Sequence, residues 1–305
     1  MSLVPQQPNR NCIVVLLCLH FLVLLYTACD LTKPEDYDPD YTPEISVFGL
    51  LSPEPRFTFV VVERTMRIGE RDYGFYGDGA RQSPDTIIKD ARVRILSAQD
   101  TVRFSFHQDT SAMDYWFGSN YRQKGLYLDL ENKLGVEPGV TYHLLIETAD
   151  GRVVRGTTRI PGPARILSHA DYDTLSYRPE TVIKWQDDPN TAAFQMHFYK
   201  TCWGHNWQTD REEWIGYNLA SDYMYTEPYA GLEHINDWTM DWPGNTCSDT
   251  AAIKIMSMDR NYYDFIRTNT GLAEISGTQL ELLDGGVGVF GSVNFYSTRV
   301  IIESP

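Results

Sequence analysis

The sequence predicts a mainly β protein: an N-terminal immunoglobulin-like β-sandwich followed by a second β-rich domain with one short helix. Apolar and polar residues alternate in short runs through residues 44–160, and turn-forming residues separate these runs. Strand-like runs resume within residues 164–305, around a single helical segment. The 305 residues are long enough to form two hydrophobic cores of ordinary size.

The N-terminus has the features of an export signal. Its polar start carries Arg10 as the only charge, and an apolar run follows over residues 12–26. A run of this length before small residues is typical of a secretory signal. Because the small residues stand directly before Cys29, residues 1–28 are interpreted as a lipoprotein signal peptide and Cys29 as the lipidated residue. An uncleaved anchor helix and secretion with a free Cys29 are the alternatives.

A solvated tether is expected after the lipidated cysteine. Residues 29–43 are rich in acids and prolines and contain almost no aliphatic side chain, which is typical of an extended segment. The whole chain has a formal net charge of −15. An acidic protein repels phosphate backbones, so nucleic acid is not an expected partner.

About seven short strands are expected between residues 44 and 160, which is the number typical of an immunoglobulin-like sandwich. Residues 91–95 and 102–106 alternate cleanly and are joined by Ser97–Asp100, which indicates a hairpin. A long loop is expected at 67–83. Further strands are predicted over residues 57–61, 126–130, 142–146 and 152–159.

A domain boundary is expected where prolines interrupt this pattern. Ile160-Pro-Gly-Pro163 removes backbone donors and permits a bend. Asp259 is the expected N-cap of a helix over residues 259–268, with Tyr263 and Ile266 facing inward. Strands of the second domain are predicted over residues 181–185, 193–201, 251–258, 278–283 and 295–303.

Several features together resemble a known family. The chain combines a lipoprotein signal and an acidic tether with Tyr-Tyr-Asp-Phe at Tyr262–Phe265 and Gly-Gly-Val-Gly-Val-Phe-Gly at Gly285–Gly291. This combination resembles an uncharacterised, domain-of-unknown-function family of Bacteroidota outer-membrane lipoproteins with an Ig-like sandwich and a C-terminal Gly-Gly-x-Gly-x-Phe-Gly motif. The resemblance implies attachment to the outer membrane, frequent company of TonB-dependent receptors, and no established catalytic residues.

The C-terminal glycines also match a dinucleotide-binding pattern. Gly286-Val-Gly288-Val-Phe-Gly291 fits G-x-G-x-x-G. That motif must follow a strand and open a helix whose N-terminus receives the pyrophosphate. The residues after Gly291 have the pattern of a β-strand, so the glycines are predicted to form a bulge or bend with positive φ, and no cofactor is expected.

A disulfide between Cys202 and Cys247 is expected. They remain as a pair once the signal is removed and Cys29 is acylated, and an exported chain folds in an oxidising compartment. Cys202-x-x-His205, together with His197, His234 and Cys247, also has ligand types that suit zinc. Zinc and unpaired thiols are the alternatives, and no metal site is expected.

An insertion at residues 202–250 is dense in aromatic residues, and six of the seven tryptophans lie between Trp185 and Trp242. Such rings stack on sugars or fill protein interfaces. Most of them are expected to form a small core of the insertion itself. The remainder provides a possible ligand or partner surface, made from Trp203, Trp207, Trp214, Tyr217, Trp238 and Trp242.

The sequence contains no recognisable catalytic motif, so no enzymatic activity is expected. The leading hypothesis is an outer-membrane-anchored binding or accessory lipoprotein on the periplasmic or cell-surface face, supporting a TonB-dependent transporter or holding a glycan or other polymer. The alternative is a structural or assembly lipoprotein without a small ligand. A third hypothesis is an extracytoplasmic glycan-active enzyme, which would require two acids to converge in a cleft.

Overall fold

The structure, a computed structural model, confirms the mainly β fold with one short α-helix in the part of the chain that it describes. The expected signal peptide, most of the expected tether and the expected loop at 67–83 lie outside that part. Among the described helices, none combines the length and apolar character needed to cross a membrane. The described residues are 41–65, 86–108, 125–176, 181–206, 211–220, 225–231, 246–269 and 282–303.

The N-terminal half contains seven strands in the described residues, and their order in the sheet is β1-β2-β5-β4-β3-β6-β7. All neighbouring pairs in this series are antiparallel. A 3-10 turn, η2 (Pro55–Phe57), precedes β2. The strands are β1 (Ile45–Leu51), β2 (Phe59–Arg64), β3 (Arg92–Leu96), β4 (Thr101–His107), β5 (Leu126–Leu128), β6 (Thr141–Glu147) and β7 (Val153–Arg159).

The expected hairpin between residues 91–95 and 102–106 is confirmed. β3 and β4 pair with Val93 opposite Phe104, and the Ser97 N–H donates to the Asp100 carbonyl at 2.8 Å to close the turn. Val93 and Phe104 are buried because alternate residues of each strand face the same side. The first hydrophobic core forms on that side.

Tyr127 in β5 joins this core to the segment before β3. Its buried hydroxyl donates to the Ile88 carbonyl at 2.7 Å and accepts from the Ala91 N–H at 3.0 Å. Burial raises the pKa of Tyr127 to about 12. The phenol therefore stays protonated in the folded protein at a pH where the unfolded chain has already released its proton.

Loss of the Tyr127 hydroxyl is expected to lower stability and weaken the alkaline dependence. The free energy of unfolding of the native protein should fall as pH rises from 10 to about 12, because the folded state then binds more protons than the unfolded one. Tyr127→Phe should cost about 1–3 kcal/mol at pH 8 by leaving the Ala91 N–H unpaired. Urea titrations of both proteins from pH 8 to 11.5 measure this, and equal stability at every pH would contradict it.

The C-terminal half contains a second group of antiparallel strands, in the order β11-β10-β13-β14. β8 pairs in parallel with β14, and β9 with β12 forms a separate two-stranded sheet. Phe194, Met196 and Phe198 alternate along β10 into a second core. The strands are β8 (Asp173–Ser176), β9 (Val182–Lys184), β10 (Ala193–Asn206), β11 (Arg211–Ala220), β12 (Tyr229–Gly231), β13 (Thr246–Met258) and β14 (Val287–Glu303).

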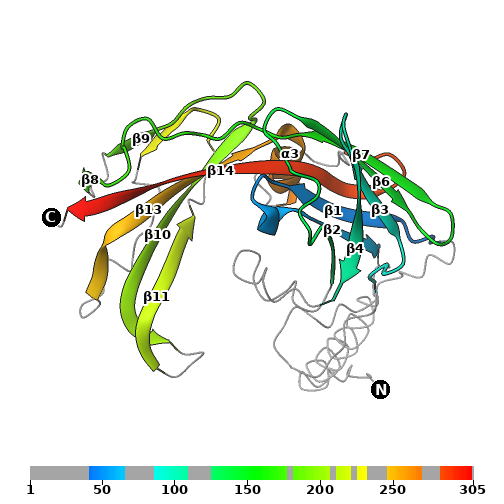
Figure 1. Cartoon of the computed structure of the whole chain (residues 1–305), viewed down its shortest axis with the longest axis horizontal. Coiled ribbons are helices and arrows are strands. Elements are labelled where there is room, and N and C mark those ends of the chain that lie inside the picture. Colours follow the sequence, from blue (N-terminus) through cyan, green and yellow to red (C-terminus); the bar gives the residue numbers. More distant parts are fainter. Residues whose placement is uncertain are drawn as a thin grey trace, which may run out of the picture.

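The C-terminal strand β14 belongs to both halves. Its first part pairs in parallel with β1, where Ser46–Leu51 lie opposite Val287–Ser292, and its second part pairs antiparallel with β13. Figure 1 shows β14 running across the molecule from one group of strands to the other. Phe290 accordingly lies in the first core and Val300 in the second. One strand thus contributes to both cores. The domain boundary expected between residues 160 and 164 stays a prediction.

The helix α3 (Arg260–Asn269) lies against β14 and covers a third apolar cluster. Asp259 is its N-cap, as predicted, because Asp259 Oδ1 accepts from the Tyr262 N–H at 3.0 Å. Tyr263 and Ile266 pack on the cluster, so the predicted inward face is confirmed. The helix therefore fixes the point where β14 passes from β1 to β13.

Candidate functional site

The glycine-rich segment forms the bend that the sequence predicts. Gly285 has φ +81° and Gly288 has φ +109°, values that favour glycine. A Cβ atom at Gly288 would overlap the carbonyl oxygen of Val47, its partner on β1, and one at Gly285 would overlap the carbonyl oxygen of Val153. The glycines therefore let the chain approach the backbones of β1 and β7 closely.

Phe290 lies at the centre of this contact. Its ring is fully buried in the first core, between Gly49 of β1 and Gly156 of β7. An added Cβ at Gly49 would lie 2.8 Å from the ring, and one at Gly156 would lie 2.9 Å from the Cβ of Phe290. The small residues on both strands thus make room for one large side chain from β14.

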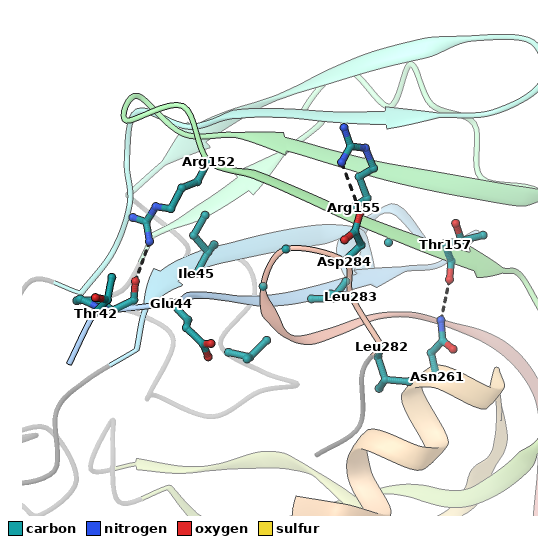
Figure 2. A pocket seen from close by; sticks show the side chains of 15 residues that line it. Thr42, Glu44, Ile45, Arg152, Arg155, Thr157, Asn261, Leu282, Leu283 and Asp284 are labelled. Atoms are coloured by element: carbon teal, nitrogen blue, oxygen red, sulfur yellow. Dashed lines mark hydrogen bonds and ion pairs between the residues drawn. The ribbon is translucent and has the colours of Figure 1, made fainter. Parts of the chain in front are cut away.

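A pocket of about 1140 Å³ opens beside the glycine segment. Four parts of the chain line it: the residues before β1, the first half of β7, the start of α3, and the turn before β14 (Figure 2). Ile45 and Leu283, which are almost completely buried, provide apolar surface. The lining residues are Thr42, Pro43, Glu44, Ile45, Arg152, Arg155, Gly156, Thr157, Asn261, Leu282, Leu283, Asp284, Gly285, Gly286 and Val287.

The polar side chains of the pocket are held by neighbours. Arg155 pairs with Asp284 at 3.4 Å, and Arg152 donates to the Pro43 carbonyl at 2.8 Å. Asn261 donates to the Thr157 carbonyl at 2.7 Å, as Figure 2 shows, and so ties the start of α3 to β7. The rim is therefore polar and pre-organised, and its arginines already have anionic or carbonyl partners.

The carboxylates of this pocket differ from those of a glycan hydrolase. Glu44 and Asp284 are the carboxylates that line the pocket, but both are exposed, and the Asp284 side chain is 78% exposed and ion-paired. A catalytic acid of a glycan hydrolase usually lies in apolar surroundings that keep it protonated. A mixed polar and apolar wall whose arginines are already paired instead fits a peptide segment.

The structure places only part of the predicted aromatic surface. Trp203 in β10 is 43% exposed and is the register partner of Trp214 in β11. Tyr217 of β11 is the register partner of Lys200 in β10. Trp207, Trp238 and Trp242 lie outside the described residues. Trp185, by contrast, is buried in the second core.

Cys202 and Cys247 are direct cross-strand partners in β10 and β13. Cys202 is 1% exposed and lies at a register shift that follows Lys200. His197 lies before Cys202 on β10, opposite Lys254 of β13. Within the described ranges, no group of three or more His, Cys, Asp or Glu side chains converges as a metal site would require.

A comparison with known protein families identifies the family of this chain. Residues 32–299 match the family described as a domain of unknown function, DUF4249. The chain belongs to the DUF4249 family. No curated protein matches it significantly. One similar solved structure, protocadherin gamma B2 extracellular cadherin domains 3–6, shares 11% identity at a TM-score of 0.14, with 87% of this chain and 50% of that chain covered. This DUF4249 chain thus spans half of that chain.

Sequence reasoning did not find the pocket of this DUF4249 chain. Its walls come from residues 42–45, 152–157 and 282–287, which are distant in sequence and meet only through the β1–β14 pairing. The glycine segment was the one available signal. It indicated a bend, but a bend alone does not tell which strands it joins.

Proposed function

We propose that the chain is an outer-membrane-anchored accessory lipoprotein that binds an envelope protein through the pocket of Figure 2. The observation that carries this proposal is the position of the pocket at the end of the tether, because Thr42–Ile45 form part of its wall. A lipid on Cys29 would be at most about 45 Å of extended chain away from Thr42. A ligand in the pocket would therefore lie close to the membrane.

The chemistry of the pocket supports a protein partner. A polar rim with paired arginines around apolar surface from Ile45 and Leu283 is the composition of a protein interface. The lipoprotein signal and the resemblance to Bacteroidota lipoproteins suggest a TonB-dependent transporter as the class of partner. In this proposal the chain acts by binding, and it performs no covalent chemistry.

A structural or assembly role is the second candidate. The buried position of Trp185 and the sharing of β14 between both halves favour it, because aromatic residues and the C-terminal motif then serve the fold. In that case the pocket would have no occupant.

Affinity purification of the full chain from outer membranes separates these two functions. Glu44→Trp fills the pocket from an exposed position, and Glu131→Trp is the matched control because its side chain is 72% exposed in a turn that does not line the pocket. We expect one envelope protein to co-purify with the native chain and with the control, and at least about tenfold less with Glu44→Trp. Equal recovery with all three proteins, or no partner with any, would contradict the proposal.

We also propose that Cys202 and Cys247 form a disulfide in the exported protein. Their register as cross-strand neighbours supports it, since such pairs have Cα atoms about 4.5–5.5 Å apart, within the range that a disulfide spans. The bond would stabilise the protein by about 3–4 kcal/mol.

The disulfide is checked by alkylation of the denatured mature protein. Without reductant, iodoacetamide should modify neither Cys202 nor Cys247, and with reductant it should modify both. The Cys202→Ser and Cys247→Ser double variant should unfold at a lower urea concentration than the oxidised protein. Full alkylation of both thiols before reduction would show that the bond does not form.

A further inference from the structure

Tyr172 is an exposed aromatic residue in an uncommon backbone conformation. It lies directly before β8 with φ +67°, a value that L residues with large side chains rarely adopt. Tyr172 is 50% exposed, so the conformation does not serve to bury its ring in a core. Such outliers are characteristic of sites where a side chain must be presented in one orientation.

Arg299 of β14 holds this ring in place. Its guanidinium carbon lies 4.4 Å from the ring centre of Tyr172, which is a stacking distance. The Tyr172 N–H donates to the Arg299 carbonyl at 2.7 Å. The ring is therefore fixed to a strand that runs through both halves of the molecule.

Asp171 completes the cluster. Its carboxylate accepts from Arg299 Nη2 at 2.7 Å and Nε at 3.3 Å, and the Arg299 N–H donates to Asp171 Oδ1 at 2.9 Å. These hydrogen bonds lower the pKa of Asp171 and raise that of Arg299, so both stay ionised. The positive and negative charges cancel, and both side chains are about half exposed, at 55% for Arg299 and 48% for Asp171.

The cluster has the chemistry of a sugar-binding platform. An aromatic ring offers a flat apolar surface to the C–H face of a pyranose, while the fixed carboxylate accepts from hydroxyl groups and the guanidinium donates to them. Ile301, which is 41% exposed, follows on the same face of β14 and extends the apolar surface. Cancelled charges favour a neutral ligand over a phosphate or an acidic sugar.

We propose that Tyr172, Arg299 and Asp171 form a binding site for a neutral polysaccharide. Tyr172 and the ion pair beside it are about half exposed, so the site fits an internal unit of a long chain. None of its three residues lines the pocket of Figure 2, and it stands whether or not a protein binds that pocket.

Native affinity electrophoresis in gels that contain glycogen, xyloglucan or galactomannan tests this site. We expect at least one of these neutral polysaccharides to retard the native protein, and Tyr172→Ala to raise the apparent dissociation constant at least about tenfold. Tyr229→Ala is the matched control, because Tyr229 is 53% exposed on β12 and lies outside the cluster. It should be retarded like the native protein.

Thermal unfolding of Tyr172→Gly separates a binding role from a structural one. Glycine adopts φ +67° without strain, so this variant should melt no lower than the native protein and yet lose retardation. Migration of the native protein unaffected by all three polysaccharides, or equal retardation of Tyr172→Ala, would overturn the proposal. A markedly lower melting temperature of Tyr172→Gly would also overturn it by showing that the ring stabilises the fold.

Discussion

Gly288→Ala is expected to destabilise the protein by about 4 kcal/mol or more, which places it among the most damaging single substitutions. The added Cβ would overlap the carbonyl oxygen of Val47 on β1. Gly288 also has φ +109°, which alanine adopts only with strain. Relief of the overlap requires β14 to move away from β1, and this would open the first core around Phe290.

Gly139→Ala separates the two causes. Gly139 has φ +77° but no atom within 4 Å of the position of a Cβ, so its substitution carries only the conformational penalty of about 1–2 kcal/mol. Urea denaturation of both variants, followed by tryptophan fluorescence, gives the two free energies. A Gly288→Ala variant as stable as Gly139→Ala would show that β1 and β14 are not in close contact.

Asp259→Ala is expected to lower the free energy of unfolding by about 2–4 kcal/mol. The buried carboxylate accepts from the Tyr262 N–H at 3.0 Å, the Ser292 N–H at 3.0 Å and the Thr158 hydroxyl at 2.7 Å. Alanine removes the N-cap of α3, which costs about 1 kcal/mol of stability. It also leaves the buried Ser292 N–H unpaired, which costs about 1–3 kcal/mol. Denaturant titration at pH 7 measures the loss.

Asp259→Asn is the control, since asparagine is an equally good N-cap and keeps the acceptor oxygen. It should lose less than about 1 kcal/mol at pH 7. Burial raises the pKa of Asp259, so the folded state holds its proton more tightly than the unfolded state. The aspartate form should therefore gain stability relative to the asparagine form as pH falls toward 3.8, the ordinary pKa of the group. A difference independent of pH would contradict this reading of the buried carboxylate.

Local patterns predicted the local elements well. The β3–β4 hairpin and the α3 helix with its Asp259 cap follow from periodicity and from a capping residue, which act over a few neighbours. Local boundaries were less accurate. The strand expected over 57–61 begins at Phe59, because Pro55 initiates a 3-10 turn that continues through Phe57.

Long-range pairing could not be predicted in this way. The strand expected over 295–303 begins at Val287, because glycine in a strand pattern indicates a bend and conceals the pairing with β1. The parallel register of Val47 with Gly288 joins residues that are far apart in the sequence, and no local pattern specifies it. The pocket depends on that register and was therefore missed with it.

The cluster around Tyr172 was missed for a different reason. A single tyrosine before a strand carries no motif, and its positive φ becomes visible only in the structure. The sequence directed attention to residues 202–250, where tryptophans are dense, but density of rings indicates a core as readily as a surface.

Photocrosslinking in the membrane tests the central claim, that the pocket at the end of the tether receives an envelope protein. A photoreactive amino acid replaces Glu44 in the full lipidated chain, and a second protein carries it at Glu131 as the control. We expect one strong crosslinked species from position 44 that is absent from position 131 and that disappears in a Cys29→Ala form released from the membrane. No crosslink from position 44, or the same species from both positions, would contradict the account.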